Sequence, residues 1–200
     1  IVASLVGSEM CIRDSTYPQA ELFEWGSSWL DFKDLKLNKG NNVTFVTSEK
    51  YQTSGHKLRL EIYELLKDID VSNGLQFYSH KSPPFHERRN DFFETAKFHI
   101  AVENSRQKNY FTEKIIDCFA SKTVPIYFGC PNIGKWFNTN GIITFKDMHE
   151  LDIILSNLDA SKYDVRLDAI EENYERAKKY HSDNDVVPRL TSKIVKEVNK

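Results

Sequence analysis

The sequence predicts an α/β protein built on a parallel β-sheet with helices covering both faces. Two observations support this prediction. The order strand, helix, strand occurs twice, over residues 43–78 and again over residues 98–128. The expected strands are short and rich in β-branched or aromatic residues, whereas the helices repeat apolar residues every three or four positions. Parallel strands need such a crossover, so each unit predicts two parallel strands in one sheet.

The first unit follows a less regular stretch. Residues 16–42 hold large apolar side chains without a clean period, and we expect a linker or the remnant of an upstream domain there. Gly40–Asn42 is typical of a turn. A strand over Val43–Val46 then leads through a polar loop to a helix over His56–Ile69 and a strand over Leu75–Tyr78. The helix carries one apolar stripe, formed by Leu58, Ile62, Leu65, Leu66 and Ile69.

The second unit holds the most polar loop of the central region. A short helix over Asp91–Thr95 precedes a buried strand over Phe98–Val102, and the polar loop Glu103–Tyr110 follows that strand. Thr112-Glu113-Lys114 opens the next helix, and Thr123–Phe128 forms the next strand. Right-handed crossovers place such loops on one edge of the sheet, where open α/β sheets bind their ligands.

The C-terminal part continues the alternation of strands and helices. A strand is expected over Ile142–Phe145, followed by a helix over Asp147–Leu158. Two further helices are expected over residues 161–180 and 186–199.

Composition excludes several classes of function. The 200 residues are 40% hydrophobic and 28% charged, which is typical of a globular protein. The net charge of −2 gives no electrostatic case for a nucleic acid or an acidic membrane surface as partner. Cys11, Cys118 and Cys130 have no metal-ligand spacing and indicate a reducing compartment. No run approaches the roughly 18 apolar residues of a membrane span.

The first fifteen residues, IVASLVGSEMCIRDS, differ from the rest of the chain. They begin apolar but lack a basic first region, and Glu9 interrupts the run, so they do not form a signal peptide. The segment resembles a translated adapter sequence found ahead of metagenomic reading frames. We therefore expect residues 1–15 to be a non-native leader and the natural chain to extend further upstream.

The start of the central helix is a candidate ligand site. Glu113 and Lys114 lie in its first turn, with Asn104 and Tyr110 in the loop before it. A helix N-terminus attracts phosphate, and the lysine adds a full positive charge. The glutamate could accept a hydrogen bond from a ribose or sugar hydroxyl. An alternative of about equal weight is that Glu113 only complements the helix dipole and Lys114 is solvated.

Other polar residues have two interpretations each. Arg59, expected in the first turn of the earlier helix, could grip a diphosphate at the same edge or be a surface charge. Arg88 and Arg89 could likewise contact a phosphate or the acceptor, or be surface charges. His99 alternates within a strand, which favours a structural histidine over a metal ligand. Residues 183–185, Asp-Asn-Asp, match a DxD metal motif, but their place between helices favours a helix cap.

Three runs share a further pattern. They are FHIAVENS at Phe98–Ser105, YFTEKII at Tyr110–Ile116 and VPIYFG at Val124–Gly129, followed by Pro131-Asn132-Ile133. Together they resemble the signature of glycosyltransferase family 10, the α-1,3/1,4-fucosyltransferases. That signature consists of F-x-x-x-F-E-N-S/T, Y-x-T-E-K at a helix start, and V-P-I/V-x-x-G in a strand.

The resemblance implies a fold and an activity. The fold would be a Rossmann-like parallel sheet flanked by helices, the C-terminal half of a GT-B glycosyltransferase. Residues 43–182 would form its nucleotide-sugar-binding domain, and residues 183–200 a helix packed on that domain. The activity would be an inverting transfer of fucose from GDP-fucose to a glycan hydroxyl. The resemblance implies no cofactor besides the nucleotide sugar and no essential metal.

The resemblance also implies site residues, and the Arg-x-x-x-Tyr helix of the family fits Arg59 and Tyr63. Donor-binding roles are implied for Arg59, Asn104, Tyr110, Glu113 and Lys114. Arg59 and Lys114 would hold the diphosphate, and Glu113 would contact the ribose or the sugar. Glu103 belongs to the signature as a further candidate, with a structural role as its alternative.

The sequence departs from the family pattern at Val102, where an aromatic residue is usual, and at Asn109, where some members have an acidic residue or glycine. The acceptor domain and the carboxylate base of the family precede this region, so we expect the general base upstream and a fragment that binds donor without supporting transfer. Another nucleotide-sugar donor and a non-catalytic nucleotide-binding fragment remain open alternatives. The implied location is cytoplasmic, peripheral to the inner membrane in a bacterium, or the Golgi in a eukaryote whose anchor precedes this sequence.

Overall fold

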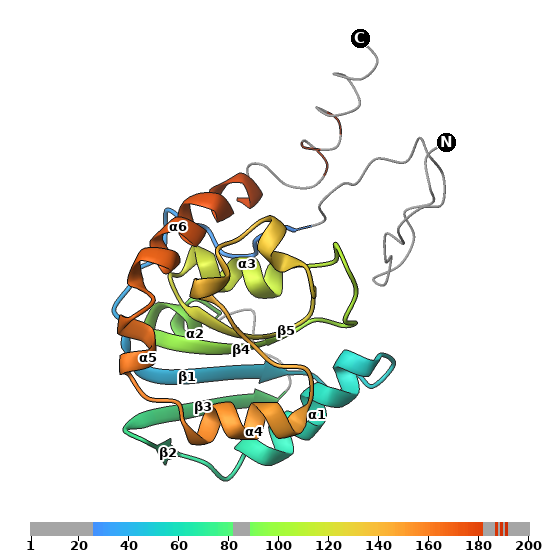
Figure 1. Ribbon diagram of the computed structural model, residues 1–200, viewed down its shortest axis with the longest axis vertical. Coiled ribbons are helices and arrows are strands. Elements are labelled where there is room, and N and C mark those ends of the chain that lie inside the picture. Colours follow the sequence, from blue (N-terminus) through green and yellow to red (C-terminus); the bar gives the residue numbers. More distant parts are fainter. Residues whose placement is uncertain (1–25, 82–88, 182–186, 188, 190, 192–200) are drawn as a thin grey trace.

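The computed structural model describes residues 26–81 and 89–181, together with residues 187, 189 and 191. A six-stranded sheet forms its centre, with helices packed on both faces (Figure 1). The strand order is β2-β3-β1-β4-β5-β6, and neighbouring strands are parallel except at the β2–β3 edge. The predicted α/β class with a parallel sheet is confirmed, and a short antiparallel edge strand is added to it.

The strands are β1 (Gly40–Thr47), β2 (Val71–Ser72), β3 (Leu75–Lys81), β4 (Ala96–Val102), β5 (Val124–Phe128) and β6 (Ile143–Thr144). The α-helices within the described residues are α1 (Ser54–Leu66), α2 (Arg89–Thr95), α3 (Glu113–Ala120), α4 (Met148–Ser156), α5 (Ser161–Asp164) and α6 (Leu167–Ala177). Short 3-10 turns cover Ile133–Lys135, Thr139–Gly141 and Lys178–Tyr180.

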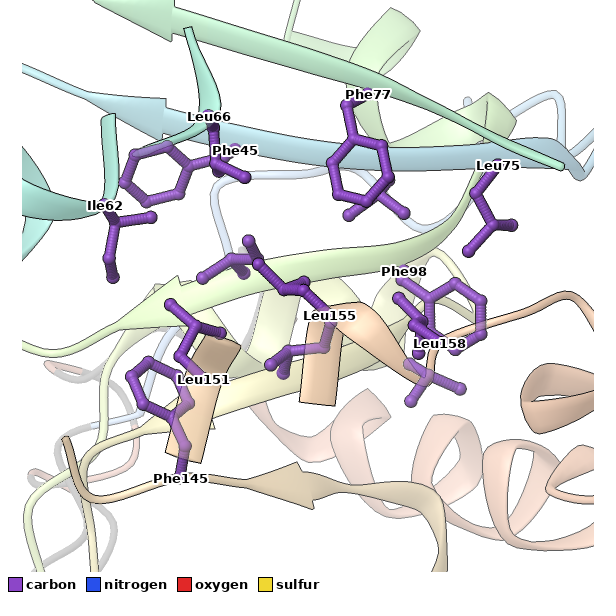
Figure 2. Packing of buried hydrophobic residues seen from close by; sticks show 14 of the residues in the cluster. Phe45, Ile62, Leu66, Leu75, Phe77, Phe98, Phe145, Leu151, Leu155 and Leu158 are labelled. Atoms are coloured by element: carbon purple, nitrogen blue, oxygen red, sulfur yellow. The ribbon is translucent and has the colours of Figure 1, made fainter. Parts of the chain in front are cut away.

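One hydrophobic core lies between the sheet and helices α1 and α4 (Figure 2). The parallel register aligns Val43 of β1 with Phe77 of β3 on one side and with Phe98 of β4 on the other. Alternate residues of each strand therefore form a continuous apolar surface. The helices cover it with Ile62 and Leu66 from α1 and Leu151 and Leu155 from α4.

A second core lies on the opposite face, beneath α2, α3 and the end of α6. It contains Phe93, Phe119 and Tyr180, and the N-terminal segment adds Leu30 to it. Asp117 of α3 ties that segment down, because its Oδ1 accepts hydrogen bonds from the Ser28 hydroxyl at 2.8 Å and the Trp29 amide at 2.9 Å. The two cores hold the sheet rigidly between them.

Two predicted elements are wrong in detail. Gly40–Asn42 was predicted to be a turn but forms the start of β1. All three residues pair with Ala96 of β4, and shifts in the strand register accommodate the additional residues of β1. The helix predicted over 161–180 breaks at Val165–Arg166. This break lets α5 bury Tyr163 in the first core while α6 carries Ala177 into the second.

Several predictions fall outside the described residues. They concern the leader 1–15, Arg88, residues 183–185 and most of the helix over 186–199. None of the helices that the structure describes has the length and apolar character required to cross a bilayer.

Candidate functional site

The strand order switches direction between β1 and β4, which is where open α/β sheets bind their ligands. Strand β3 pairs with one side of β1. Strand β4, which follows β3 in the sequence, pairs with the other side of β1. The loops after β1 and β4 consequently leave the sheet in opposite directions, and in open α/β sheets the ligand crevice lies between two such loops at the carboxyl edge. Helix α1 begins on one side of this crevice and α3 on the other, so residues far apart in sequence meet there.

The N-terminus of α1 approaches the loop after β4 very closely. Thr53 and His56 cap the helix reciprocally, at 3.1 and 3.2 Å. The Gly55 amide donates to the Asn104 carbonyl oxygen at 3.0 Å. A Cβ atom at Gly55 would lie 1.9 Å from the Glu103 carbonyl oxygen, so the residue must be glycine. Gly55 was not predicted as a site residue, although a glycine in the first turn of a helix is a usable signal.

Arg59 links α1 to the same loop. Helix α1 begins at Ser54, so Arg59 lies in its second turn and not, as predicted, in its first. The guanidinium is buried and donates to the Val102 carbonyl oxygen at 2.5 Å and to Asn104 Oδ1 at 2.9 Å. These bonds use two of its five N–H groups. Burial lowers the pKa of Arg59.

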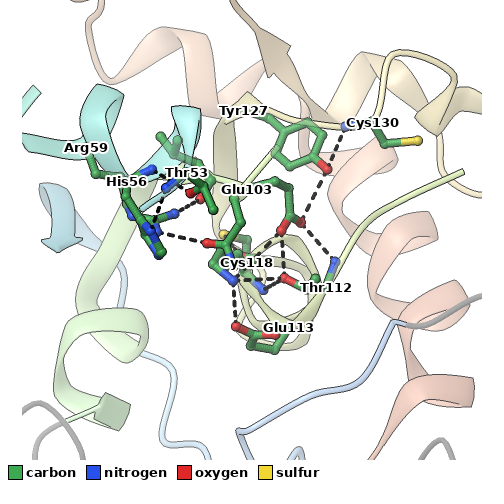
Figure 3. Close-up of polar contacts among 12 residues, drawn as sticks. Thr53, His56, Arg59, Glu103, Thr112, Glu113, Cys118, Tyr127 and Cys130 are labelled. Atoms are coloured by element: carbon green, nitrogen blue, oxygen red, sulfur yellow. Dashed lines mark hydrogen bonds and ion pairs between the residues drawn. The ribbon is translucent and has the colours of Figure 1, made fainter. Parts of the chain in front are cut away.

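The loop after β4 is anchored by the buried carboxylate of Glu103. Its oxygens accept from the Thr112 amide at 2.9 Å and the Thr112 hydroxyl at 2.7 Å, and from the Tyr127 hydroxyl at 3.4 Å. Burial raises the pKa of Glu103, while the charge of Lys114 and the hydrogen bonds from Thr112 oppose that shift. Figure 3 shows Glu103 between Tyr127 and Thr112, with Arg59 on the neighbouring helix.

Helix α3 begins as predicted, with Thr112 as its N-cap and Glu113 as its first residue. Lys114 Nζ lies 2.8 Å from Glu113 Oε1, 3.1 Å from Thr112 Oγ1 and 3.8 Å from Glu103 Oε2. The Lys114 side chain is 25% exposed and that of Glu113 is 14% exposed, so a ligand can reach both. Thr112, which connects them to Glu103, was not among the predicted site residues.

Tyr110 lies buried at the end of the loop, and its electrostatic interaction with Arg59 opposes the lowering of the Arg59 pKa by burial. The preceding Asn109 has a left-handed φ of 64° and bonds reciprocally with Asn132 of the β5 loop, at 2.8 and 2.7 Å. Asparagine tolerates this conformation, which accounts for the departure from glycine at this position. After Gly55 and Thr112, Asn132 is the third residue of the site that was not predicted from the sequence.

The structure thus brings Arg59, Asn104, Tyr110, Glu113 and Lys114 to one edge, with Glu103 beneath them. His99 lies elsewhere: it is buried in β4, 2.9 Å from the Thr44 hydroxyl, and burial lowers its pKa to about 3. Across the described residues, no group of three or more His, Cys, Asp or Glu side chains is arranged to hold a metal ion.

Comparison with known proteins identifies the family. Residues 37–188 match the model of the glycosyltransferase family 10 (fucosyltransferase) C-terminal region. The chain is 38% identical to the α-(1,3)-fucosyltransferase FucT of Helicobacter pylori over 66 residues, which are 33% of this chain and 14% of that protein. It is 29% identical to GDP-fucose protein O-fucosyltransferase 3 of Xenopus laevis over 103 residues, 46% of this chain and 22% of that protein.

Solved structures match as well. A crystal structure of an α1,3-fucosyltransferase with GDP aligns with a TM-score of 0.48 and 26% identity, covering 69% of this chain and 39% of that one. The chain therefore corresponds to a minor part of the length of its relatives. On the family match over residues 37–188, this chain belongs to glycosyltransferase family 10, the fucosyltransferases, and represents its C-terminal region.

Proposed function

We propose that this chain is the donor-binding part of an inverting fucosyltransferase that moves fucose from GDP-fucose to a glycan hydroxyl. One observation supports the proposal: the cationic side chains of Arg59 and Lys114 lie on α1 and α3, the helices that follow β1 and β4 at the switch in strand order, and each contacts the loop after β4. Family membership and relatives named for GDP-fucose support the choice of donor.

The proposed roles follow from charge and position. Arg59 and Lys114 bind the diphosphate, Glu113 accepts from a hydroxyl of the ribose or fucose, and Asn104 and Tyr110 shape the pocket. The Lys114 ammonium is paired with Glu113 at 2.8 Å. A bound diphosphate would replace the glutamate as the partner of the ammonium. Glu113 would then be released to accept from a donor hydroxyl.

The proposed chemistry assigns a limited task to this chain. In an inverting transfer, a glycan hydroxyl attacks the anomeric carbon through an oxocarbenium-like transition state while GDP leaves. Charge builds up on the leaving diphosphate, and fixed cations beside a helix N-terminus stabilise it without reorganisation. The general base would lie in the upstream domain. We propose that no resident metal is needed, since two cationic side chains reach the diphosphate.

The donor identity and the location remain parts of the proposal. The runner-up is another nucleotide-sugar donor on the same scaffold, and a non-catalytic nucleotide-binding fragment is a third reading. The enzyme would act on the cytoplasmic side of the inner membrane in a bacterium, or in the Golgi of a eukaryote with an upstream anchor.

Isothermal titration of the chain with GDP, UDP and GDP-fucose tests the proposal. We expect GDP to bind more tightly than UDP, and Lys114→Ala to weaken GDP binding by at least about 1.4 kcal/mol, which is tenfold in Kd. Lys108→Ala is the control, because Lys108 is an exposed lysine of the same loop. Tighter UDP binding would exclude the guanosine donor, and unchanged GDP affinity in Lys114→Ala would exclude its contact with the diphosphate.

A further inference from the structure

The Glu103 carboxylate is closed off from any ligand. The residue has no exposed surface. A Cβ atom at Gly129 would lie 2.3 Å from the Tyr127 hydroxyl oxygen and 2.5 Å from Glu103 Cγ, so the β5 strand end packs directly against it. Burying an ionised carboxylate is costly unless donors surround it. The buried carboxylate of Glu103 therefore depends on the hydrogen-bond donors that surround it.

The hydrogen bonds around Thr112 have a fixed direction. Thr112 Oγ1 lies 3.4 Å from the Lys114 amide nitrogen and 3.1 Å from Lys114 Nζ, and both of these groups can only donate. The two lone pairs of the hydroxyl are then occupied, so its single proton must point to Glu103 Oε2 at 2.7 Å. The carboxylate thereby orients the hydroxyl, and the hydroxyl orients the ammonium of Lys114.

The other side of the carboxylate is fixed in the same way. The Tyr127 hydroxyl accepts from the Cys130 amide at 3.0 Å, so it donates its own proton to Glu103 Oε1. The Thr112 amide donates to the same oxygen at 2.9 Å. Glu103 is thus held by the β5 loop and by the first turn of α3, and it cannot rotate without breaking both connections.

We propose that Glu103 and Thr112 are positioning residues that act through Lys114. They fix the direction of the Lys114 ammonium at the carboxyl edge of the sheet. Glu103 therefore makes no contact with the donor. This inference rests on the proposed donor-binding function, since it assigns the ammonium a diphosphate to meet.

Thr112 offers a matched pair of variants. Thr112→Ser keeps the hydroxyl, whereas Thr112→Val keeps the shape and removes it. We expect Thr112→Val and Glu103→Gln to weaken GDP binding by about fivefold or more, and Thr112→Ser to stay within about twofold of the wild type. Asp117→Asn is the control, because Asp117 is a buried carboxylate of the same helix that bonds to Ser28 and Trp29 instead.

A double-variant cycle separates positioning from a general structural effect. In a Lys114→Ala background, Thr112→Val should cause no further loss of GDP affinity, because residues that act through one another are not additive. Additive losses would show that Thr112 acts independently of Lys114 and would overturn the proposal. A Thr112→Val chain that binds GDP like the wild type would overturn it as well.

A measurement without nucleotide tests the positioning alone. In a chain with ¹³C-labelled lysine, the Lys114 Cε resonance is identified by its absence from Lys114→Ala. It should shift in Thr112→Val and Glu103→Gln but stay in place in Thr112→Ser and Asp117→Asn. An unmoved resonance in Thr112→Val would contradict the positioning role. If the resonance moves but the wild type binds no GDP, the positioning holds and the proposed donor-binding function fails.

Discussion

The two cations of the candidate site are held in different ways. Arg59 is buried and bonded to the backbone and side chain of the β4 loop, so it maintains the shape of the crevice. Lys114 is partly exposed, and its ammonium lies near oxygens of Thr112, Glu113 and Glu103 at the start of its own helix. We therefore expect Arg59 to contribute to stability as well as to binding, and Lys114 mainly to binding.

Arg59→Lys tests this difference. The lysine keeps the charge but lacks the planar fork that reaches Val102 and Asn104 together. We expect the free energy of unfolding to fall by about 1–3 kcal/mol, and GDP affinity to fall with it. Urea unfolding and calorimetric titration measure the two effects. Arg106→Lys, in an exposed part of the same loop, should change neither, and an equally stable Arg59→Lys would contradict the proposed scaffold role.

The buried carboxylate predicts a pH dependence of stability. Burial raises the pKa of Glu103 in the folded chain above its usual value of 4.5, with Glu113 adding to the shift and Lys114 opposing it. Because the folded chain binds this proton more tightly than the unfolded chain, protonated Glu103 contributes to stability below a pH of about 4.5. This contribution is lost as the pH rises through the folded-state pKa. The free energy of unfolding of the wild type should therefore fall relative to that of Glu103→Gln as the pH rises. Parallel curves from urea unfolding would show that Glu103 titrates normally.

The site residues that can be predicted from the sequence are those placed by local sequence order, and those placed by tertiary contacts cannot be predicted in this way. Local order places Glu113 and Lys114 at a helix start behind a strand, because a capping threonine precedes them, and the family resemblance selects them as site residues. Thr112 has a second role, the bond to Glu103, that depends on how the loop folds back. Tyr127 lies in the next strand and Asn132 in the loop after that strand. No local sequence pattern predicts their contacts with the loop after β4.

At the scale of elements, the contact between α1 and the β4 loop is the tightest in the site. It depends on Gly55, whose amide bonds to Asn104 and whose missing Cβ lets the helix approach. The same contact sets the distance between the two helix N-termini that flank the crevice. A change at this one position should therefore affect both stability and binding.

Gly55→Ala should destabilise the chain by about 1–3 kcal/mol, because the added methyl must push the helix and the loop apart. GDP affinity should fall as well, since the crevice changes shape. Gly40→Ala is the matched control, because a Cβ atom there meets nothing closer than 3.4 Å. Thermal unfolding with and without GDP measures both effects. A Gly55→Ala chain as stable as Gly40→Ala would contradict the close approach.

The elements themselves were predictable where periodicity is strong. The α1 stripe and the strands of both units follow from it, and the Asn73-Gly74 turn is confirmed by positive φ angles at both residues. That turn closes a hairpin with the two-residue strand β2, which is too short to show a period. The break at Val165–Arg166 was missed for a different reason: charged residues continue the helical pattern across it, and only packing on two cores requires it.

At the scale of the molecule, the strand order locates the site. Because β3 and β4 lie on opposite sides of β1, the strand order switches direction at β1 and β4, and the loops that hold Asn104 and Lys114 follow at the carboxyl edge. Lys39 marks the opposite edge, where its ammonium bonds to two carbonyl oxygens and the Thr123 hydroxyl, at 2.6–2.8 Å. We therefore assign donor binding to the carboxyl edge and structural bonding to the amino edge.

The position of the nucleotide is the central claim, and amide NMR during a GDP titration tests it directly. The amides of residues 54–56 at the start of α1, 103–106 in the β4 loop and 112–115 at the start of α3 should shift and saturate together. The amides around Lys39 and Thr123 should stay in place. Saturating shifts confined to the amino edge, or no saturating shifts at all, would contradict the account.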